Sequence, residues 1–234
     1  MYFGSCPNRP FYRRSGCDNI VSGIMGKIKV VSFDLEGTLV TPDFSLAVWY
    51  HGVPSLYAAR NGVSFQEAKS QVLEEYDRVG CQRLEWYDIK YWFDWFDLDG
   101  YQELLKNCQD KVSYYPETMS VLSSLGKAYP LVIITGTAVE FLPYLLSEIE
   151  GCFVKVFSSV SDYKQLKSSS LYLKVCQEMG VLPEEMAHVG DNWQFDFTAP
   201  GEAGVNAFYL DREGHSAPES VTDLRQFGSR LLEM

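Results

Sequence analysis

The residues most capable of chemistry begin at Asp34, which directly follows an apolar run at residues 28–33. An aspartate at the end of a buried strand presents its carboxylate to the crevice beyond the sheet, where it can act as a nucleophile. Gly37 permits a tight turn soon afterwards, and the N–H groups that follow it can hold an oxyanion. Thr135 ends another apolar run and offers a hydroxyl donor. These residue types suit the transfer of an anionic group.

Two further aspartates and a lysine extend this set. Asp191 follows a third apolar run, and Asp196 comes five residues after it. With Asp34 they provide the hard oxygen ligands that Mg²⁺ requires. Lys167 or Lys164 stands before a helical pattern and offers a mobile positive charge. A carboxylate nucleophile beside a divalent cation, a lysine and hydrogen-bond donors favours phosphoryl transfer.

Charge balance suggests a separate role for Glu36, the fourth carboxylate of the set. Four ionised carboxylates and a bound phosphate ester carry more negative charge than one Mg²⁺ and one lysine can compensate. Like charges about 4 Å apart repel by about 4 kcal/mol at an effective dielectric constant of about 20. One carboxyl group should therefore hold a proton, and Glu36 can deliver that proton to the leaving oxygen as a general acid.

The elements that must position these residues alternate between strand and helix. Short apolar runs typical of buried parallel strands lie at residues 28–33, 131–134, 153–157, 186–189 and 205–210. Helical patterns lie between these runs, at residues 117–127, 140–148 and 171–179. This alternation predicts an α/β fold with a Rossmann-like parallel sheet, which binds ligands at the carboxyl ends of its strands.

One stretch breaks the alternation. Helical patterns follow one another at residues 46–61, 64–79, 86–96 and 100–107. Ser64 followed by Glu67 is a capping box, which indicates a helix start. We therefore expect an inserted all-helical cap domain at residues 43–111. Aromatic side chains are dense at residues 86–101, and we expect most of them to pack inside the cap.

The remaining residues divide into a core and an arm. The core domain is expected to comprise residues 27–42 and 112–234. Residues 1–26 lack apolar periodicity and are expected to form a flexible arm, with Met25 as the natural start. A few aromatic or basic side chains of the cap, among them those of residues 49, 51, 57 and 60, are alternative candidates for lining a substrate pocket.

Four segments resemble, in order and spacing, the four motifs of the haloacid dehalogenase (HAD) superfamily. They are residues 34–39 (Asp-Leu-Glu-Gly-Thr-Leu), residues 135–137 (Thr-Gly-Thr), the lysine at 167 or 164, and residues 190–192 (Gly-Asp-Asn) with Asp196. The resemblance extends from about residue 27 to the end of the chain, and the helical insertion resembles the cap of members that carry it between the first two motifs. It implies a Mg²⁺-dependent phosphatase that acts on a small phosphorylated metabolite.

The resemblance also implies roles for the motif residues. Asp34 would be the nucleophile that forms an aspartyl-phosphate. It would hold Mg²⁺ together with the main-chain carbonyl of Glu36 and the carboxylate of Asp191. The phosphoryl oxygens would be bound by Thr135 and by the N–H of Gly136, next to the turn at Gly37.

The lysine of the third motif would neutralise charge on the nucleophile and the phosphate. Lys167 fits the spacing to Gly180 better than Lys164, although neither is followed by the proline that is usual in the family. Asp196 would orient that lysine or a metal-bound water, and it belongs to the predicted metal-binding group.

Glu36 departs from the family pattern, which usually has aspartate at this position in phosphatases. Glutamate reaches about 1.5 Å further, and a misplacement of about 1 Å can lower a rate by roughly 10²-fold. Two alternatives therefore stay open. One is a metal-independent 2-haloacid dehalogenase, although the acidic residue at position 36 favours phosphate hydrolysis over it, because the dehalogenases of the superfamily do not use an acidic residue there. The other is a catalytically weak binding protein that keeps the fold.

Composition limits the partners of the chain. The net charge of −11 disfavours nucleic acid and anionic membranes as partners. No apolar run approaches the roughly 20 residues that span a bilayer. The six cysteines are scattered, and we expect free thiols and a cytoplasmic location. The sequence does not indicate an oligomeric state.

Overall fold

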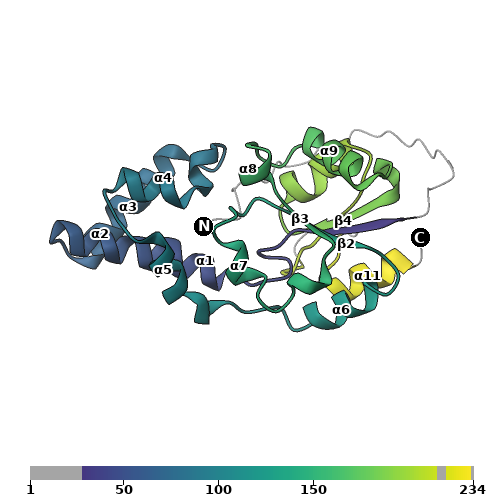
Figure 1. Cartoon of the computed structure of the whole chain (residues 1–234), viewed down its shortest axis with the longest axis horizontal. Coiled ribbons are helices and arrows are strands. Elements are labelled where there is room, and N and C mark those ends of the chain that lie inside the picture. Colours follow the sequence, from purple (N-terminus) through teal and green to yellow (C-terminus); the bar gives the residue numbers. More distant parts are fainter. Residues whose placement is uncertain (1–27, 215–219, 233–234) are drawn as a thin grey trace.

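A five-stranded parallel sheet forms the centre of the computed structural model, which describes residues 28–214 and 220–232 (Figure 1). The expected N-terminal arm and the proposed start at Met25 lie outside these ranges. The strands are β1 (Val30–Phe33), β2 (Leu131–Thr135), β3 (Lys155–Ser158), β4 (Met186–Gly190) and β5 (Asn206–Tyr209). Their order is β3-β2-β1-β4-β5, and every neighbouring pair is parallel. The predicted α/β class with a Rossmann-like sheet is confirmed.

The central strand β1 lies between β2 and β4. All residues of these three strands are buried, which explains why apolar residues predominate in their sequences. Phe33 is in register with Ile133 of β2 and with Val189 of β4. The carboxyl ends of the three strands therefore lie side by side, and the residues that follow them meet at one edge of the sheet.

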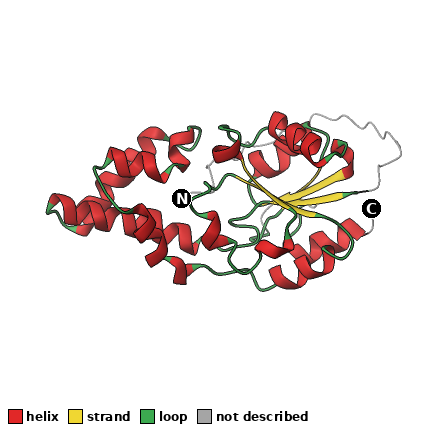
Figure 2. Ribbon diagram, viewed as in Figure 1, coloured by secondary structure: helices red, strands yellow, loops and turns green. Residues whose placement is uncertain are grey.

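Helices cover both faces of the sheet (Figure 2). The helices of the core are α6 (Thr118–Leu125), α7 (Leu142–Leu145), α8 (Ser159–Asp162), α9 (Ser169–Met179), α10 (Ala199–Glu202) and α11 (Leu224–Leu232). Short 3₁₀ turns lie at Gln109–Lys111, Glu150–Cys152 and Pro183–Glu185, and a π-helix lies at Trp193–Thr198. Side chains alternate along β1, so Val31 packs with α6 and α11 while Val30 packs with α9 and α10.

A separate group of helices follows β1 and lies at one end of the molecule (Figure 1). It comprises α1 (Asp43–Ala47), a π-helix (Val48–Gly52), α2 (Val53–Asn61), α3 (Phe65–Val79), a 3₁₀ turn (Leu84–Tyr87), α4 (Ile89–Trp95) and α5 (Tyr101–Asn107). Ser64 begins α3 as predicted, because its hydroxyl accepts a hydrogen bond from the N–H of Glu67 at 3.2 Å. The inserted all-helical cap is confirmed, whereas its exact limits at residues 43 and 111 remain predictions.

Aromatic rings form the interior of this inserted group. Trp92 is fully buried and donates its indole N–H to the carbonyl of Trp86 at 3.2 Å. Its ring lies edge-on to Tyr76, with 4.5 Å between the ring centroids, and stacks on Phe96. The expectation that most of the aromatic stretch packs inside the cap is thus met, while Trp95 is 54% exposed.

Several elements differ in extent from the sequence patterns. The helix expected at residues 140–148 is confined to Leu142–Leu145, because Pro143 fits the first turn of a helix but not its interior. The helix expected at residues 46–61 begins earlier, at Asp43, and its chain passes through a π-helical turn. The strand expected at residues 153–157 begins only at Lys155.

The cysteine expectation requires one correction. Cys108, Cys152 and Cys176 are free thiols, but Cys81 is disulfide-bonded, so the prediction of six free thiols is wrong at this position. Cysteine spacing and chain length do not reveal which thiols lie close together in the fold. None of the helices in residues 28–214 and 220–232 combines the length and apolar character needed to cross a bilayer.

We predict that Trp92→Ala destabilises the protein by about 3–5 kcal/mol, because it removes a fully buried ring and leaves a cavity. The control is Trp95→Ala on the same helix, which should change the free energy of unfolding by about 0.5 kcal/mol or less since that ring is largely exposed. Urea denaturation followed by circular dichroism measures both. Equal losses would contradict the assigned core.

Candidate active site

The predicted site residues gather at the carboxyl edge of the sheet. Asp34 follows β1, Thr135 ends β2 and Asp191 follows β4. A cavity of about 730 Å³ opens at this edge. Its wall includes every residue of the predicted site, namely Asp34, Glu36, Gly37, Thr135, Gly136, Lys167, Asp191 and Asp196. The structure therefore brings together side chains that are far apart in the sequence.

The three aspartates form one cluster. Asp34, Asp191 and Asp196 each place a carboxylate oxygen within 4.8 Å of the others. Two glycines allow this approach. A Cβ atom on Gly37 would lie 2.3 Å from Asp191 Oδ2, and Gly37 also has a φ of +80° that favours glycine. A Cβ atom on Gly190 would lie 2.4 Å from Asp196 Cγ.

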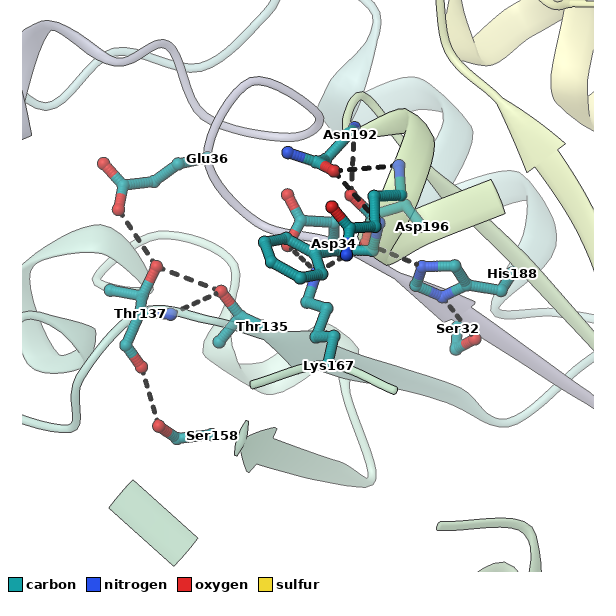
Figure 3. Close-up of polar contacts among 12 residues, drawn as sticks. Ser32, Asp34, Glu36, Thr135, Thr137, Ser158, Lys167, His188, Asn192 and Asp196 are labelled. Carbon is teal, nitrogen blue, oxygen red and sulfur yellow. Dashed lines mark hydrogen bonds and ion pairs between the residues drawn. The ribbon is translucent and has the colours of Figure 1, made fainter. Parts of the chain in front are cut away.

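Lys167 is the cation of this cluster. Its Nζ donates to Asp34 Oδ1 and to Asp196 Oδ1, both at 2.5 Å (Figure 3). The Lys167 side chain is buried, so both charge-assisted bonds lie away from bulk water. Lys164, the other candidate of the sequence, is exposed and has a φ of +53°.

Asp196 is held by several donors besides the lysine. Its Oδ2 accepts a hydrogen bond from the N–H of Asn192 at 3.0 Å, and its Oδ1 lies 3.2 Å from His188 Nε2. His188 also contacts the hydroxyl of Ser32 through Nδ1 at 2.8 Å and is fully buried. This matches the expectation of a packed, hydrogen-bonded histidine. Asp196 is thus largely saturated by protein donors.

The pKa values separate Asp196 from its two neighbours. Burial raises the pKa of Asp34 to about 7 despite the opposing charge of Lys167. Burial also raises the pKa of Asp191 well above its usual range, and the charges of Asp34 and Asp196 add to the rise. Burial acts in the same direction on Asp196, but Lys167 and His188 outweigh it and lower that pKa to about 2. Asp34 therefore shares its one positive neighbour, Lys167, with Asp196, and Asp191 has no hydrogen bond to that lysine, so this donor set fits a hard divalent cation.

Glu36 lies apart from the aspartates, in a chain of hydroxyl groups. Thr135 Oγ1 donates to Thr137 Oγ1, and Thr137 Oγ1 donates to Glu36 Oε2, each at 3.0 Å (Figure 3). Burial raises the pKa of Glu36, and hydrogen bonds with the side chains of Ser45 and Thr137 oppose that rise. The Glu36 carboxyl group is therefore held between the core and α1 of the inserted helices.

Residues of the inserted helices also reach the cavity. Trp49 and Tyr87 belong to its wall, and Tyr87 Cε1 would lie 3.9 Å from a Cβ atom on Gly136. Of the side chains considered from the sequence at 49, 51, 57 and 60, Trp49 is the one that the described wall includes. Aromatic density marked the segment around Tyr87, but it did not single out this ring.

Sequence reasoning also missed Ser45, Thr137 and Arg212. Thr137 stands in the Thr-Gly-Thr segment at residues 135–137, yet its contact with Glu36 depends on the meeting of β2 with the loop after β1. Arg212 follows the end of β5, and its Nε and Nη2 donate to the carbonyls of Gly37 and Thr38. The position of Arg212 just beyond the end of a strand is the sequence signal that could have identified it.

Comparison with known proteins agrees with this geometry. A family model described as haloacid dehalogenase-like hydrolase matches residues 28–204. The phosphoglycolate phosphatase of Vibrio vulnificus (strain YJ016) is 28% identical over 221 residues, which cover 84% of this chain and 90% of that protein. The GMP/IMP nucleotidase YrfG of Escherichia coli (strain K12) is 35% identical over 72 residues, which cover 31% of this chain and only 32% of the nucleotidase.

Solved structures share the fold. A HAD phosphatase from Thermococcus onnurineus superposes with a TM-score of 0.76 at 26% identity, covering 87% of this chain and 98% of that one. A 2-haloacid dehalogenase from Pseudomonas syringae pv. Tomato DC3000 superposes with a TM-score of 0.61 at 20% identity, covering 88% and 98%. This chain belongs to the family of haloacid dehalogenase-like hydrolases.

Proposed function

We propose that this hydrolase is a Mg²⁺-dependent phosphomonoesterase that acts on a small phosphorylated metabolite through an aspartyl-phosphate on Asp34. The observation that carries the proposal is the cluster of Asp34, Asp191 and Asp196 around Lys167 at the wall of a cavity. The names of the phosphatase and nucleotidase relatives support the same class of substrate.

Asp34, Asp191 and the main-chain carbonyl of Glu36 would hold Mg²⁺. When bound, the ion would neutralise charge on the phosphoryl oxygens and on the nucleophile. Asp196 would support the metal site without binding the ion itself, because its oxygens already accept hydrogen bonds from Lys167, His188 and the N–H of Asn192. It fixes the Lys167 ammonium group against Asp34.

In the first step, a carboxylate oxygen of Asp34 attacks phosphorus in line with the leaving oxygen. The new bond joins Asp34 to phosphorus, and the bond from phosphorus to the leaving oxygen breaks. Thr135 and the N–H of Gly136 would donate to the phosphoryl oxygens, and Lys167 would balance their charge. Protonated Glu36 gives its proton to the departing alcohol.

In the second step, ionised Glu36 takes a proton from water. That water attacks phosphorus, the bond to Asp34 breaks, and inorganic phosphate leaves. Thr137 and Ser45 orient Glu36 for both steps, which offsets the longer reach of glutamate at this position. The inserted helices, which supply Trp49 and Tyr87 to the cavity wall, would limit the entry of bulk water.

A dehalogenase function is less well supported, because the neighbouring dehalogenase structure shares only the fold. A metal-independent reaction would also give no role to the uncompensated carboxyl group of Asp191. We keep a cytoplasmic location as part of this proposal. The free thiols of Cys108, Cys152 and Cys176 favour a reducing compartment, whereas the disulfide at Cys81 opposes it.

The direct test is an assay of phosphate release from a panel of phosphate esters. With Mg²⁺ we expect turnover, with excess EDTA none, and for Asp34→Asn a loss of at least about 10³-fold because the nucleophile is gone. The exposed Asp99→Asn serves as a matched control and should keep full activity. Equal rates with Mg²⁺ and EDTA would refute the role of the metal.

We predict that Glu36→Ala slows the hydrolysis of an alkyl phosphate by about 10²–10⁴-fold, the usual contribution of a general acid. In kcat/KM, which reports the first step alone, an aryl ester such as p-nitrophenyl phosphate should slow much less, because its leaving group needs no proton. Thr137→Val should show the same selectivity in weaker form, and Thr137→Ser should restore the rate. If kcat/KM falls equally for both esters, Glu36 is not the acid.

The buried carboxyl groups also predict how stability depends on pH. The pKa of Asp34, about 7 in the folded protein, exceeds the value of about 3.9 in an unfolded chain. The unfolded state therefore loses this proton first, so stability falls as the pH rises toward the folded-state pKa. Asp191 shifts in the same direction.

Between about pH 6.5 and pH 8, the raised pKa values of Asp34 and Asp191 should outweigh the opposing effect of the lowered pKa of His188, so the Tm of the metal-free protein should fall. Saturating Mg²⁺ should raise the Tm more at the higher pH, since the ionised pair binds the cation. Asp191→Asn should reduce both effects. A Tm that rises across this range without metal would contradict the assignment.

A further inference from the structure

One arginine of the cavity wall links segments that follow different strands of the sheet. Arg212 lies just after β5, and its Nε and Nη2 donate to the carbonyls of Gly37 and Thr38 at 3.1 and 2.6 Å. Strand β4 lies between β5 and β1 in the sheet, and Asp191 follows β4. The Arg212 side chain therefore ties the loop after the proposed nucleophile to the segment that lies two strands away.

The guanidinium group of Arg212 is itself held on two further sides. Its Nη1 donates to Glu117 Oε1 at 2.8 Å, and the Glu117 side chain is only 7% exposed. Burial acts to raise the pKa of Glu117, but hydrogen bonds from Arg212 and from the main chain outweigh it and lower that pKa. The Arg212 guanidinium carbon also lies 3.4 Å from the centre of the Tyr115 ring. An ion pair and a cation–π contact thus fix the direction in which the guanidinium donates.

Tyr115 is joined to the same loop through its main chain. Its N–H donates to the carbonyl of Leu39 at 3.2 Å, and the hydroxyl of Thr118 donates to that carbonyl at 2.8 Å. Three successive carbonyls of the loop, at residues 37–39, therefore accept hydrogen bonds from outside it. Arg212 supplies the donors for the two that come first after Glu36.

Gly37 connects this anchoring to the aspartates. A Cβ atom on Gly37 would lie 2.3 Å from Asp191 Oδ2, so its backbone lies directly against that carboxylate. The carbonyl of the same residue is bound by Arg212. Glu36, whose main-chain carbonyl is the proposed Mg²⁺ ligand, directly precedes Gly37. A shift of Gly37 would therefore change how the Glu36 carbonyl lies relative to Asp191.

Building on the proposed phosphatase function, we infer that Arg212 is a positioning residue for the metal site. It holds the loop at residues 36–38 so that the main-chain carbonyl of Glu36 and the carboxylates of Asp34 and Asp191 face one cation. In this role Arg212 acts through the loop and not through contact with the phosphoryl group.

The role requires the shape of the guanidinium group as well as its charge. Arg212 donates to three acceptors in different directions, whereas a lysine offers one ammonium group on a flexible stem. The variant Arg212→Lys therefore keeps the positive charge and removes the fixed set of donors. Misplacing a reacting group by about 1 Å can lower a rate by roughly 10²-fold.

The first test measures phosphate release by the full-length protein, with p-nitrophenyl phosphate at saturating Mg²⁺. For Arg212→Lys we expect kcat to fall by about 10–100-fold and KM to change by no more than about three-fold, because the nucleophile and the metal ligands are misplaced while the groups that bind the phosphoryl oxygens remain. Arg225→Ala, at an exposed position on α11, is the matched control and should keep the wild-type values.

The second test needs no turnover. The rise of Tm with Mg²⁺ concentration, measured without substrate, gives the dissociation constant of the ion. Arg212→Lys should raise that constant by at least about five-fold, and Arg225→Ala should leave it unchanged. A residue that only stabilises the fold would lower the metal-free Tm without changing the constant. If either kcat or the Mg²⁺ dissociation constant of Arg212→Lys stays within about two-fold of wild type, the inference is overturned.

Two further results keep the test decisive. Should Arg212→Lys fail to fold, as judged by circular dichroism, Arg212→Gln takes its place with the same expected directions, since its planar amide keeps two donors. If the wild-type protein releases no phosphate with Mg²⁺, the proposed function itself fails. If the wild type is active and the variant matches it, the phosphatase function stands and only the role of Arg212 fails.

Discussion

Three carboxyl groups that lie within 4.8 Å of one another in a buried site repel strongly, and one lysine compensates only part of their charge. The lysine is shared by Asp34 and Asp196. Asp196 also has His188 and a main-chain N–H, so its pKa falls while those of Asp34 and Asp191 rise. This imbalance is the physical basis for the divalent cation that we propose at the site, where Asp34 and Asp191 would have a different task from Asp196.

The strand order and two glycines bring these carboxyl groups close together. The strand order places the ends of β1, β2 and β4 next to one another, so Asp34, Thr135 and Asp191 meet without long connecting loops. Gly37 and Gly190 leave the space that the aspartates occupy. The inserted helices complete the site from the other side, through Ser45 near Glu36 and through Tyr87 near Gly136.

Much of this could be predicted from the sequence, because the strands are short apolar runs and the reactive residues stand directly after them. Asp34 and Asp191 belong to this class. The contacts of Glu36 could not be predicted, since its partners Thr137 and Ser45 come from different parts of the chain and no local pattern links them. The same holds for Arg212, whose contacts with main-chain carbonyls depend only on tertiary packing.

A crystal structure of the enzyme with Mg²⁺ and vanadate, a mimic of the transferred phosphoryl group, tests the central claim most directly. The account predicts one Mg²⁺ bound to the carboxylates of Asp34 and Asp191, with vanadium next to an Asp34 oxygen and Lys167 still joining Asp34 to Asp196. Mg²⁺ bound away from these aspartates, or vanadate in contact with a nucleophile other than Asp34, would contradict it.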